Sequence, residues 1–216
     1  MKYSIVFPGQ GSQSIGMLSD LSSNFSIVSE IFQEASDALG VDLWKIAQED
    51  QEALNLTENT QPIMLASGYA TYKILSNEAK LSPVCMAGHS LGEYTALVAS
   101  KSLNFVDAVK LVRRRAELMQ SAVPKGSGSM AAVLGLDDAK VIEICAQSSS
   151  YGVVEAVNFN SPGQVVIAGE KEAVIQACDE MKEAGAKRAL VLPVSVPSHC
   201  SLMTSAAEEF EKSVEV

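Results

Sequence analysis

The sequence predicts an α/β fold: a mostly parallel sheet covered by helices, with an inserted ferredoxin-like subdomain. In the first part of the chain, short apolar runs at residues 3–7 and 84–87 are typical of strands. Each run is followed by a glycine-containing turn and then by helical periodicity. In the second part, strand and helix patterns follow one another in the order βαββαβ. Residues 124–129 form a stretch of proline, glycine and serine that reads as a linker between the two patterns.

The helices of the first part follow from the spacing of apolar residues and from two residues that mark helix ends. Apolar residues recur every three or four positions in residues 24–39, which predicts an amphipathic helix that stops at Gly40. Pro62 suits the first turn of a helix that runs to about residue 75. Two further helices are expected at residues 93–99 and 105–120.

The second part supplies a complete ferredoxin-like pattern. Strands are expected at residues 130–134, 153–157, 164–168 and 187–192, and helices at residues 137–147 and 170–184. We therefore expect a ferredoxin-like subdomain over residues 127–196. The main core would consist of residues 1–126 together with residues 197–216, which end in an acidic helix from residue 204 without an obvious cap.

Composition limits the classes of function. Of the 216 residues 47% are hydrophobic and 19% are charged, which is enough apolar material for a core and argues against disorder. The formal net charge of −10 makes nucleic acid an unexpected partner. No apolar stretch is long enough to span a membrane, and no secretory signal is visible. The four cysteines fit no zinc pattern and are expected to be reduced and structural, so a cytoplasmic protein is expected.

The segment Gly88-His-Ser-Leu-Gly92 matches the pattern G-x-S-x-G between an expected strand and an expected helix. Its glycines permit a sharp turn that presents the Ser90 hydroxyl, and the first amides of the helix point at the same place. Ser90 is therefore the candidate nucleophile of an acyl-transfer enzyme. The Leu91 amide is a natural donor to the oxyanion.

A serine nucleophile needs a base, and the chain contains two histidines, His89 and His199. His89 is adjacent to Ser90, and neighbouring side chains at such a turn should point apart, which leaves His199 as the candidate base. The alternative for a lone histidine is a purely structural role. Cys200, next to His199, is a rival nucleophile, but it has the same geometric problem and no turn presents it.

Arg115 lies on the apolar stripe of the helix expected at residues 105–120. Arg113 and Arg114 align with polar positions and are expected to be solvated. An arginine on an apolar face needs an anionic partner. That partner is either a carboxylate of the same chain, in an internal salt bridge, or the carboxylate of a substrate.

Four segments together resemble the malonyl-CoA:acyl-carrier-protein transacylases of bacterial fatty acid synthesis. They are Phe7-Pro-Gly-Gln-Gly-Ser-Gln13, Gly88-His-Ser-Leu-Gly-Glu-Tyr94, Asn158-Phe-Asn-Ser-Pro-Gly-Gln164 and Pro193-Val-Ser-Val-Pro-Ser-His-Cys200. The resemblance covers the whole chain and implies an α/β-hydrolase-like core with the ferredoxin-like insertion. It implies a ping-pong reaction in which malonyl passes from malonyl-CoA to the nucleophile and then to the phosphopantetheine thiol of acyl carrier protein.

The resemblance also implies roles for individual residues. Ser90 takes the place of the nucleophile and His199 that of its base, while the backbone amides of Gln10 and Leu91 take the place of the oxyanion hole. Arg115 would bind the free malonyl carboxylate, and Asn160 would line the acyl site. No metal or redox cofactor is expected: malonyl-CoA and coenzyme A are substrate and product. The expected partner is acyl carrier protein, and a monomer is expected.

Members of the resembled family continue past the position of Val216. We therefore expect this sequence to lack a C-terminal part of the core, including the group that orients the catalytic histidine, and to expose apolar sheet surface. Two alternatives to a transacylase stay open. One is a serine hydrolase or thioesterase with water as the acceptor, and the other is a catalytically impaired fragment that binds carrier protein.

Overall fold

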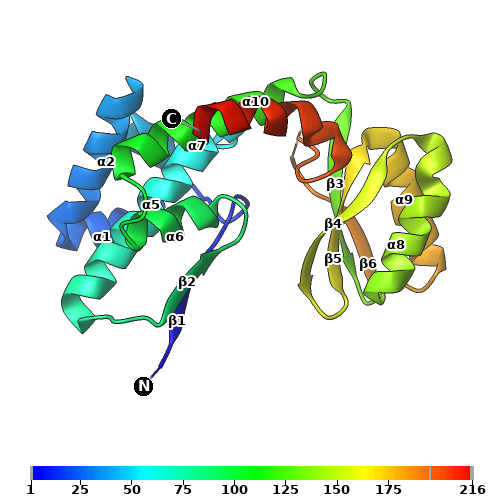
Figure 1. Cartoon of the computed structure of the whole chain (residues 1–216), viewed down its shortest axis with the longest axis horizontal. Helices are drawn as coiled ribbons and strands as arrows, with labels where there is room; N and C mark the ends of the chain where they lie inside the picture. Colours follow the sequence, from blue (N-terminus) through cyan, green and yellow to red (C-terminus); the bar gives the residue numbers. More distant parts are fainter. Residues whose placement is uncertain (1, 195, 215–216) are drawn as a thin grey trace. The chain divides into compact units, whose positions relative to one another are not determined.

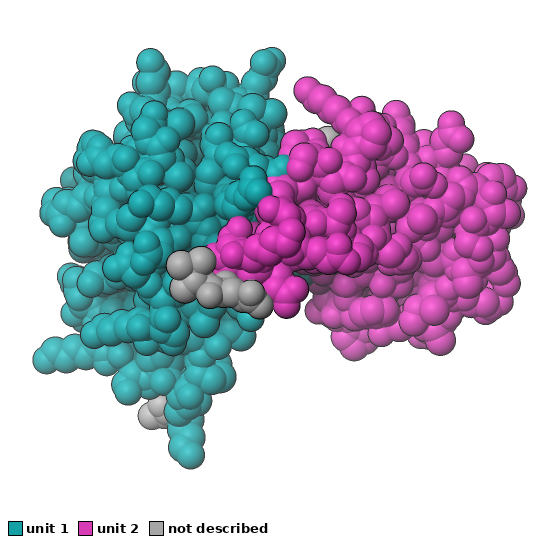
Figure 2. All heavy atoms as spheres, turned by 45° about the horizontal axis from the view of Figure 1, so that its top comes forward, with its two compact units in different colours: residues 1–117 teal, residues 118–216 magenta. Residues whose placement is uncertain are grey.

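A computed structural model of the chain describes residues 2–194 and 196–214. The chain forms two compact units, residues 1–117 and residues 118–216, which Figure 2 shows in separate colours. The α/β fold class that the sequence predicts is confirmed: the first unit contains a parallel sheet, and the second contains an antiparallel sheet with helices. The discontinuous domain bounds proposed from the sequence stay a prediction.

The first unit is built on two parallel strands, β1 (Ser4–Phe7) and β2 (Cys85–Gly88), which pair directly. Figure 1 shows these strands side by side, with helices α5 (Thr57–Ala79) and α6 (Gly92–Ala99) nearby. The other helices of this unit are α1 (Ser19–Asn24), α2 (Ser26–Leu39), α3 (Leu43–Glu49), α4 (Gln51–Leu54) and α7 (Phe105–Ser121), the last of which runs on past residue 117. Their apolar faces form one core that includes Phe32, Leu65 and Val109.

The helices of this unit differ from the expectations in three places. The helix expected at residues 24–39 is present as α2, but it begins at Ser26, after the extended backbone of Phe25, and a separate short helix, α1, precedes it. Helices α3 and α4 were not predicted; both are short, and Asp42 and Asp50 cap them through side-chain bonds to backbone amides. The end of α2 was correct, since Gly40 has a left-handed backbone with φ 66°.

The third correction concerns the start of α5. This helix begins at Thr57 rather than near Pro62, so the proline lies inside it. Proline has no N–H, and the Glu58 carbonyl, four residues earlier, therefore lacks its helical donor. Arg113 Nη1 on α7 donates to this carbonyl at 3.3 Å and to Asn59 Oδ1 at 2.9 Å. A side chain from a distant helix thus compensates for the proline and lets α5 start earlier.

The same contacts correct the expectation that Arg113 is solvated. Its side chain is 24% exposed and also forms an ion pair with Glu117, at 2.8 Å between Nε and Oε1. Arg113 therefore joins α7 to α5 in the part of the unit that also holds Arg115. Arg114, by contrast, is exposed as expected.

The second unit has the predicted ferredoxin-like order. Strands β3 (Gly128–Leu134), β4 (Val154–Ser161), β5 (Gln164–Glu170) and β6 (Arg188–Val191) form one antiparallel sheet in the order β4-β5-β3-β6. Helices α8 (Asp138–Gln147) and α9 (Lys171–Glu183) lie on the same side of this sheet (Figure 1). They bury one sheet face in a core that includes Val133, Ile167 and Met181.

The opposite face of this sheet is covered in part by the end of the chain. Met130, Val166 and Ala168 on this face pack with Cys200, and Leu202 packs against the same cluster. The chain then forms a short 3₁₀ helix, η2 (Ser201–Met203), and helix α10 (Thr204–Val214). A second 3₁₀ helix, η1 (Ser148–Tyr151), follows α8. The segment after β6 is thus anchored on the sheet.

Some surface features bear on the earlier expectations. Exposed apolar side chains are present on and next to the two-stranded sheet: Val6 on β1 is 70% exposed, and Val84, just before β2, is 62% exposed. All four cysteines are free thiols, as expected. Cys145 lies in the core of the second unit, and burial raises the pKa of its thiol to about 12. A search of the described residues for a helix long and apolar enough to cross a membrane finds none.

Candidate active site

The Ser90 turn joins β2 to α6 in the way that the sequence predicts. Ser90 has a left-handed backbone with φ 51°, which is strained for a residue with a side chain. A Cβ at Gly88 would lie 1.8 Å from the Gly92 carbonyl carbon, so only glycine allows the strand and the helix to approach so closely. The Gly92 N–H donates to the His89 carbonyl at 2.9 Å and closes the turn. The turn therefore holds Ser90 at the start of α6.

The glycine-rich loop after β1 lies against this turn. A Cβ at Gly92 would lie 2.2 Å from the Phe7 carbonyl oxygen, and one at Gly9 would lie 2.7 Å from the His89 carbonyl oxygen. Gln10 follows directly in this loop, and its side chain donates to Thr57 Oγ1 at 3.4 Å. The two backbone segments that carry Gln10 and Leu91 are thus neighbours.

The two amides predicted to bind an oxyanion are those of Gln10 and Leu91. Among the residues that the structure describes, no acceptor is bonded to the backbone N–H of Gln10 or of Leu91. Backbone donors are nearly always paired in folded proteins, with protein groups or with water. Two such donors on adjacent segments beside Ser90 fit the predicted role of a site for negative charge.

Arg115 on α7 reaches the same place. Its Nη2 donates to Ser90 Oγ at 3.0 Å, and its Nη1 donates to Gln61 Oε1 at 2.9 Å. The guanidinium carbon lies 5.7 Å from the centroid of the Tyr94 ring. Burial lowers the pKa of Arg115 below its ordinary value, and the nearby Tyr94 and Glu93 oppose that shift. The structure therefore brings Ser90 and Arg115 together.

The hydrogen-bond partners of Arg115 bear on the two readings of this arginine. In the described part of the chain these partners are the uncharged groups of Ser90 and Gln61 together with the Tyr94 hydroxyl, and no ion pair to Arg115 is found there. Within residues 2–194 and 196–214, the internal salt bridge weighed from the sequence is therefore not formed. A partly buried cation bound by neutral groups is suited to receiving an anionic group from outside.

Gln61 and Tyr94 are site residues that sequence reasoning missed. Gln61 is 1% exposed on α5, so its amide is fixed in the protein interior beside Arg115. Burial raises the pKa of the Tyr94 hydroxyl above its ordinary value, so it stays protonated near the guanidinium. A glutamine in a helix gives no sequence signal for such a role. Tyr94 did stand in the Gly88–Tyr94 segment of the resemblance.

The remaining predicted residues, His199 and Asn160, belong to the second unit. His199 is exposed and has a left-handed backbone with φ 71°. Asn160 lies near the end of β4 and is exposed. Cys200, the rival nucleophile, is 4% exposed, and its Sγ donates to the Pro197 carbonyl at 3.1 Å. Because burial raises the pKa of the Cys200 thiol, its thiolate is disfavoured and the rival reading loses support.

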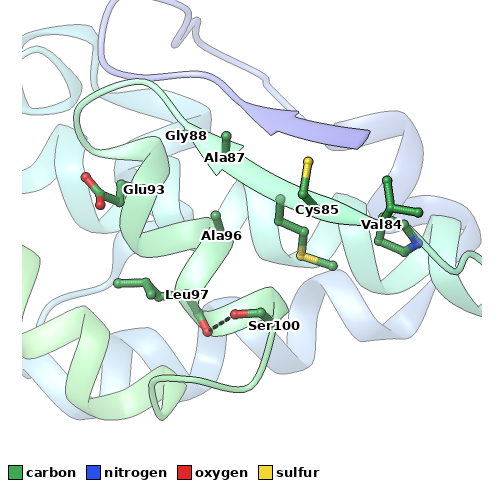
Figure 3. A pocket seen from close by; sticks show the side chains of 10 residues that line it. Val84, Cys85, Ala87, Gly88, Glu93, Ala96, Leu97 and Ser100 are labelled. Atoms are coloured by element: carbon green, nitrogen blue, oxygen red, sulfur yellow. Dashed lines mark hydrogen bonds between the residues drawn. The ribbon is translucent and has the colours of Figure 1, made fainter. Parts of the chain in front are cut away.

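A surface pocket of the first unit does not coincide with these residues. It is lined by residues of β2, of α6 and of the segments next to them, including Val84, Ala96 and Ser100 (Figure 3). Ser90 and Arg115 are not among the lining residues. The candidate site is therefore defined by its polar contacts rather than by this pocket.

Comparison with known proteins places the chain in a family. The family model described as acyl transferase domain matches residues 4–215. The chain is 56% identical over 216 residues to the malonyl CoA-acyl carrier protein transacylase of Haemophilus influenzae, and 54% identical over 209 residues to that of Escherichia coli K12. These alignments cover 99% and 96% of this chain. The chain belongs to the malonyl CoA-acyl carrier protein transacylases.

Solved structures agree with this assignment. The malonyl CoA-acyl carrier protein transacylase of Coxiella burnetii matches with a TM-score of 0.97 at 46% identity, over 99% of this chain and 68% of that one. A malonyl-transacylase in complex with its type II PKS acyl-carrier protein matches with a TM-score of 0.97 at 50% identity, over 100% of this chain and 70% of that one. The chain spans 69% of the Haemophilus transacylase and 68% of the Escherichia one. As a transacylase, it is an acyltransferase.

Proposed function

We propose that this chain transfers a malonyl group from malonyl-CoA to the phosphopantetheine thiol of an acyl carrier protein in fatty acid biosynthesis. The observation that carries the proposal is the contact between Arg115 Nη2 and Ser90 Oγ at 3.0 Å. It joins a nucleophile at a sharp turn to a partly buried cation bound by neutral groups. A malonyl thioester has the two matching groups, a carbonyl for Ser90 and a free carboxylate for Arg115.

The reaction follows in two half-reactions. Ser90 Oγ attacks the thioester carbonyl while His199 accepts the hydroxyl proton, and the backbone amides of Gln10 and Leu91 donate to the resulting oxyanion. When the intermediate collapses, the C–S bond breaks, and coenzyme A leaves as a thiol with the proton from His199. The carrier thiol then gives its proton to His199 and attacks the carbonyl of malonyl-Ser90, the ester C–O bond breaks, and Ser90 Oγ takes the proton back from His199. Asn160 would line the acyl site.

These steps use side chains, backbone amides, the thioester donor and the carrier thiol, and we invoke no metal or redox cofactor. The complex of a related malonyl-transacylase with its acyl-carrier protein supports a carrier protein as the acceptor. A cytoplasmic location is part of the proposal, because free cysteines are typical of a reducing compartment.

Release of coenzyme A distinguishes transfer from hydrolysis. With malonyl-CoA alone, the proposal predicts a burst of about one coenzyme A per chain, because the acyl-enzyme then waits for a thiol acceptor. Addition of carrier protein with its phosphopantetheine should start continuous turnover, and carrier protein without that group should not. Continuous release without any carrier protein would favour a serine hydrolase. Binding of carrier protein without a burst would favour the impaired fragment.

Arg115→Ala should change which acyl group the chain prefers. Loss of a buried charge-assisted contact with the substrate carboxylate should slow acylation by malonyl-CoA by roughly 10²-fold. Acetyl-CoA has no free carboxylate, so its acylation rate should change much less. The two rates, measured by quenched-flow release of coenzyme A, give the ratio directly.

Arg114→Ala is the matched control, because it removes an exposed arginine from the same helix. It should leave the ratio of malonyl to acetyl rates unchanged. An equal loss with both substrates in folded Arg115→Ala would mean that Arg115 is structural, and the assignment of the carboxylate site would be wrong.

A further inference from the structure

The segment that carries His199 is held by anchors on two strands of the antiparallel sheet. Before the histidine, Pro197 packs on β3: a Cβ at Gly128 would lie 2.3 Å from Pro197 Cδ, so the ring occupies space that only glycine leaves open. After the histidine, Ser201 is bound by Glu155 on β4. His199 thus lies between one apolar anchor and one charged anchor.

The charged anchor uses both oxygens of the Glu155 carboxylate. Oε2 accepts the Ser201 backbone N–H at 2.9 Å, and Oε1 accepts the Ser201 hydroxyl at 2.6 Å. Hydrogen bonds to an ionised carboxylate are stronger than those between neutral groups. One of them holds the Ser201 backbone and the other holds its side chain, so the residue is fixed at two points.

Ser201 is also the first residue of the helical run formed by η2 and α10. Its N–H has no acceptor within the helix, and a negative charge is favoured at this end. Glu155 therefore caps this run from a strand 46 residues earlier in the chain. The cap that is missing from the local sequence around residue 204 is supplied by the sheet.

His199 needs such anchoring because its backbone is strained. Its φ of 71° is left-handed, a conformation that disfavours a residue with a Cβ and that persists only where the surroundings impose it. Cys200, which follows, is buried and bonded to the Pro197 carbonyl, so the turn from Pro197 to Cys200 closes on itself. The direction in which the imidazole leaves the chain thus depends on where this turn is held.

We infer that Glu155 is a positioning residue for His199: through Ser201 it holds the turn that aims the imidazole. The inference rests on the proposed function, in which His199 is the base. Glu155 itself acts on the reaction only through the backbone of residues 199–201. Its loss should displace the base rather than remove it, and displacement of a catalytic group by about 1 Å can cost about 10²-fold in rate.

The test compares Glu155→Ala with Glu183→Ala, which removes an exposed glutamate at the end of α9 in the same unit. Glu155→Ala should slow formation of malonyl-Ser90 about 10- to 100-fold at saturating malonyl-CoA, with the KM unchanged. Glu155→Gln keeps one acceptor oxygen and should lie between the parent and the alanine variant. Glu183→Ala should match the parent.

A second measurement reports the imidazole itself. The chain has two histidines, so a ¹H–¹³C spectrum contains one Cε1–H signal for His89 and one for His199. In Glu155→Ala the His199 signal should shift or broaden, while the His89 signal should stay in place. A folded Glu155→Ala chain that keeps the rate of the parent and an unshifted His199 signal would overturn the inference.

Two further arms keep the result decisive. If Glu155→Ala does not fold, Ser201→Ala takes its place, because it removes only the hydroxyl contact with Glu155. A shift of the His199 signal in Ser201→Ala would support the inference, and an unchanged signal would overturn it. If the parent chain forms no malonyl-Ser90, the proposed function fails. The spectra still decide whether Glu155 positions His199.

Discussion

Ser90→Ala should reduce malonyl transfer to carrier protein by roughly 10⁴-fold or more, because losses of this size follow removal of a nucleophile in comparable serine enzymes. Alanine lacks the oxygen that forms the acyl-enzyme, and the rival nucleophile Cys200 is buried with its pKa raised. The rate of malonyl-carrier formation under multiple-turnover conditions measures this loss. The left-handed backbone at residue 90 is equally strained for serine and alanine, so the fold should be retained.

Cys200→Ala is the matched variant for this comparison. It should retain transfer at close to the parent rate, because the thiol contributes packing and one bond to the Pro197 carbonyl. The opposite pattern, with transfer kept in Ser90→Ala and lost in folded Cys200→Ala, would identify the cysteine as the nucleophile and reject the serine.

His199→Ala should slow acylation of Ser90 by about 10²–10⁴-fold, which is the usual contribution of a general base. The loss is smaller than for Ser90→Ala because the nucleophile, the two amides and Arg115 all remain. Single-turnover release of coenzyme A measures it without a carrier protein. The defect should be largest near neutral pH and should decrease at high pH, where hydroxide can replace the imidazole as the base.

The other histidine provides the control. His89 lies in the Ser90 turn, with Nδ1 3.1 Å from where a Cβ of Gly9 would be, so its ring faces the glycine-rich loop. His89→Gln should therefore have a modest effect on the rate. If His89→Gln lost as much activity as His199→Ala and both variants were folded, the choice of base made from the sequence would be wrong.

The parts of the fold that the sequence predicted are those with a local cause. Glycine is needed at positions 88 and 92 because a Cβ there would lie 1.8 Å and 2.2 Å from backbone atoms. A five-residue motif is enough to predict this requirement. The ferredoxin-like unit was predicted for a similar reason, since each of its strands and helices has its own periodicity. In both cases, the conformation that the local sequence favours is the one found in the structure.

The parts that could not be predicted depend on residues far apart in the chain. Nothing near Pro62 indicates that Arg113 will bond to the Glu58 carbonyl and let α5 begin at Thr57. The cap that Glu155 gives to Ser201 is equally distant. Pairings of this kind appear only once the helices and strands are packed.

The candidate site shows both situations. Ser90 and Leu91 could be derived from the turn motif alone, whereas Gln10 and Asn160 entered through the family resemblance. Arg115 could be singled out from its apolar helix face, but the choice between a salt bridge and a substrate clamp could not be made there. Its contacts with Gln61 and Ser90 exclude the salt bridge within the described chain, because both partners are neutral.

The most direct test of the central claim is the intact mass of the purified chain after mixing with malonyl-CoA, followed by peptide mapping. The account predicts a mass increase of one malonyl group, located on Ser90 and absent from Ser90→Ala. It also predicts that carrier protein with its phosphopantetheine removes this group. A folded chain that gains no malonyl group, or that carries it on a residue other than Ser90, would contradict the account.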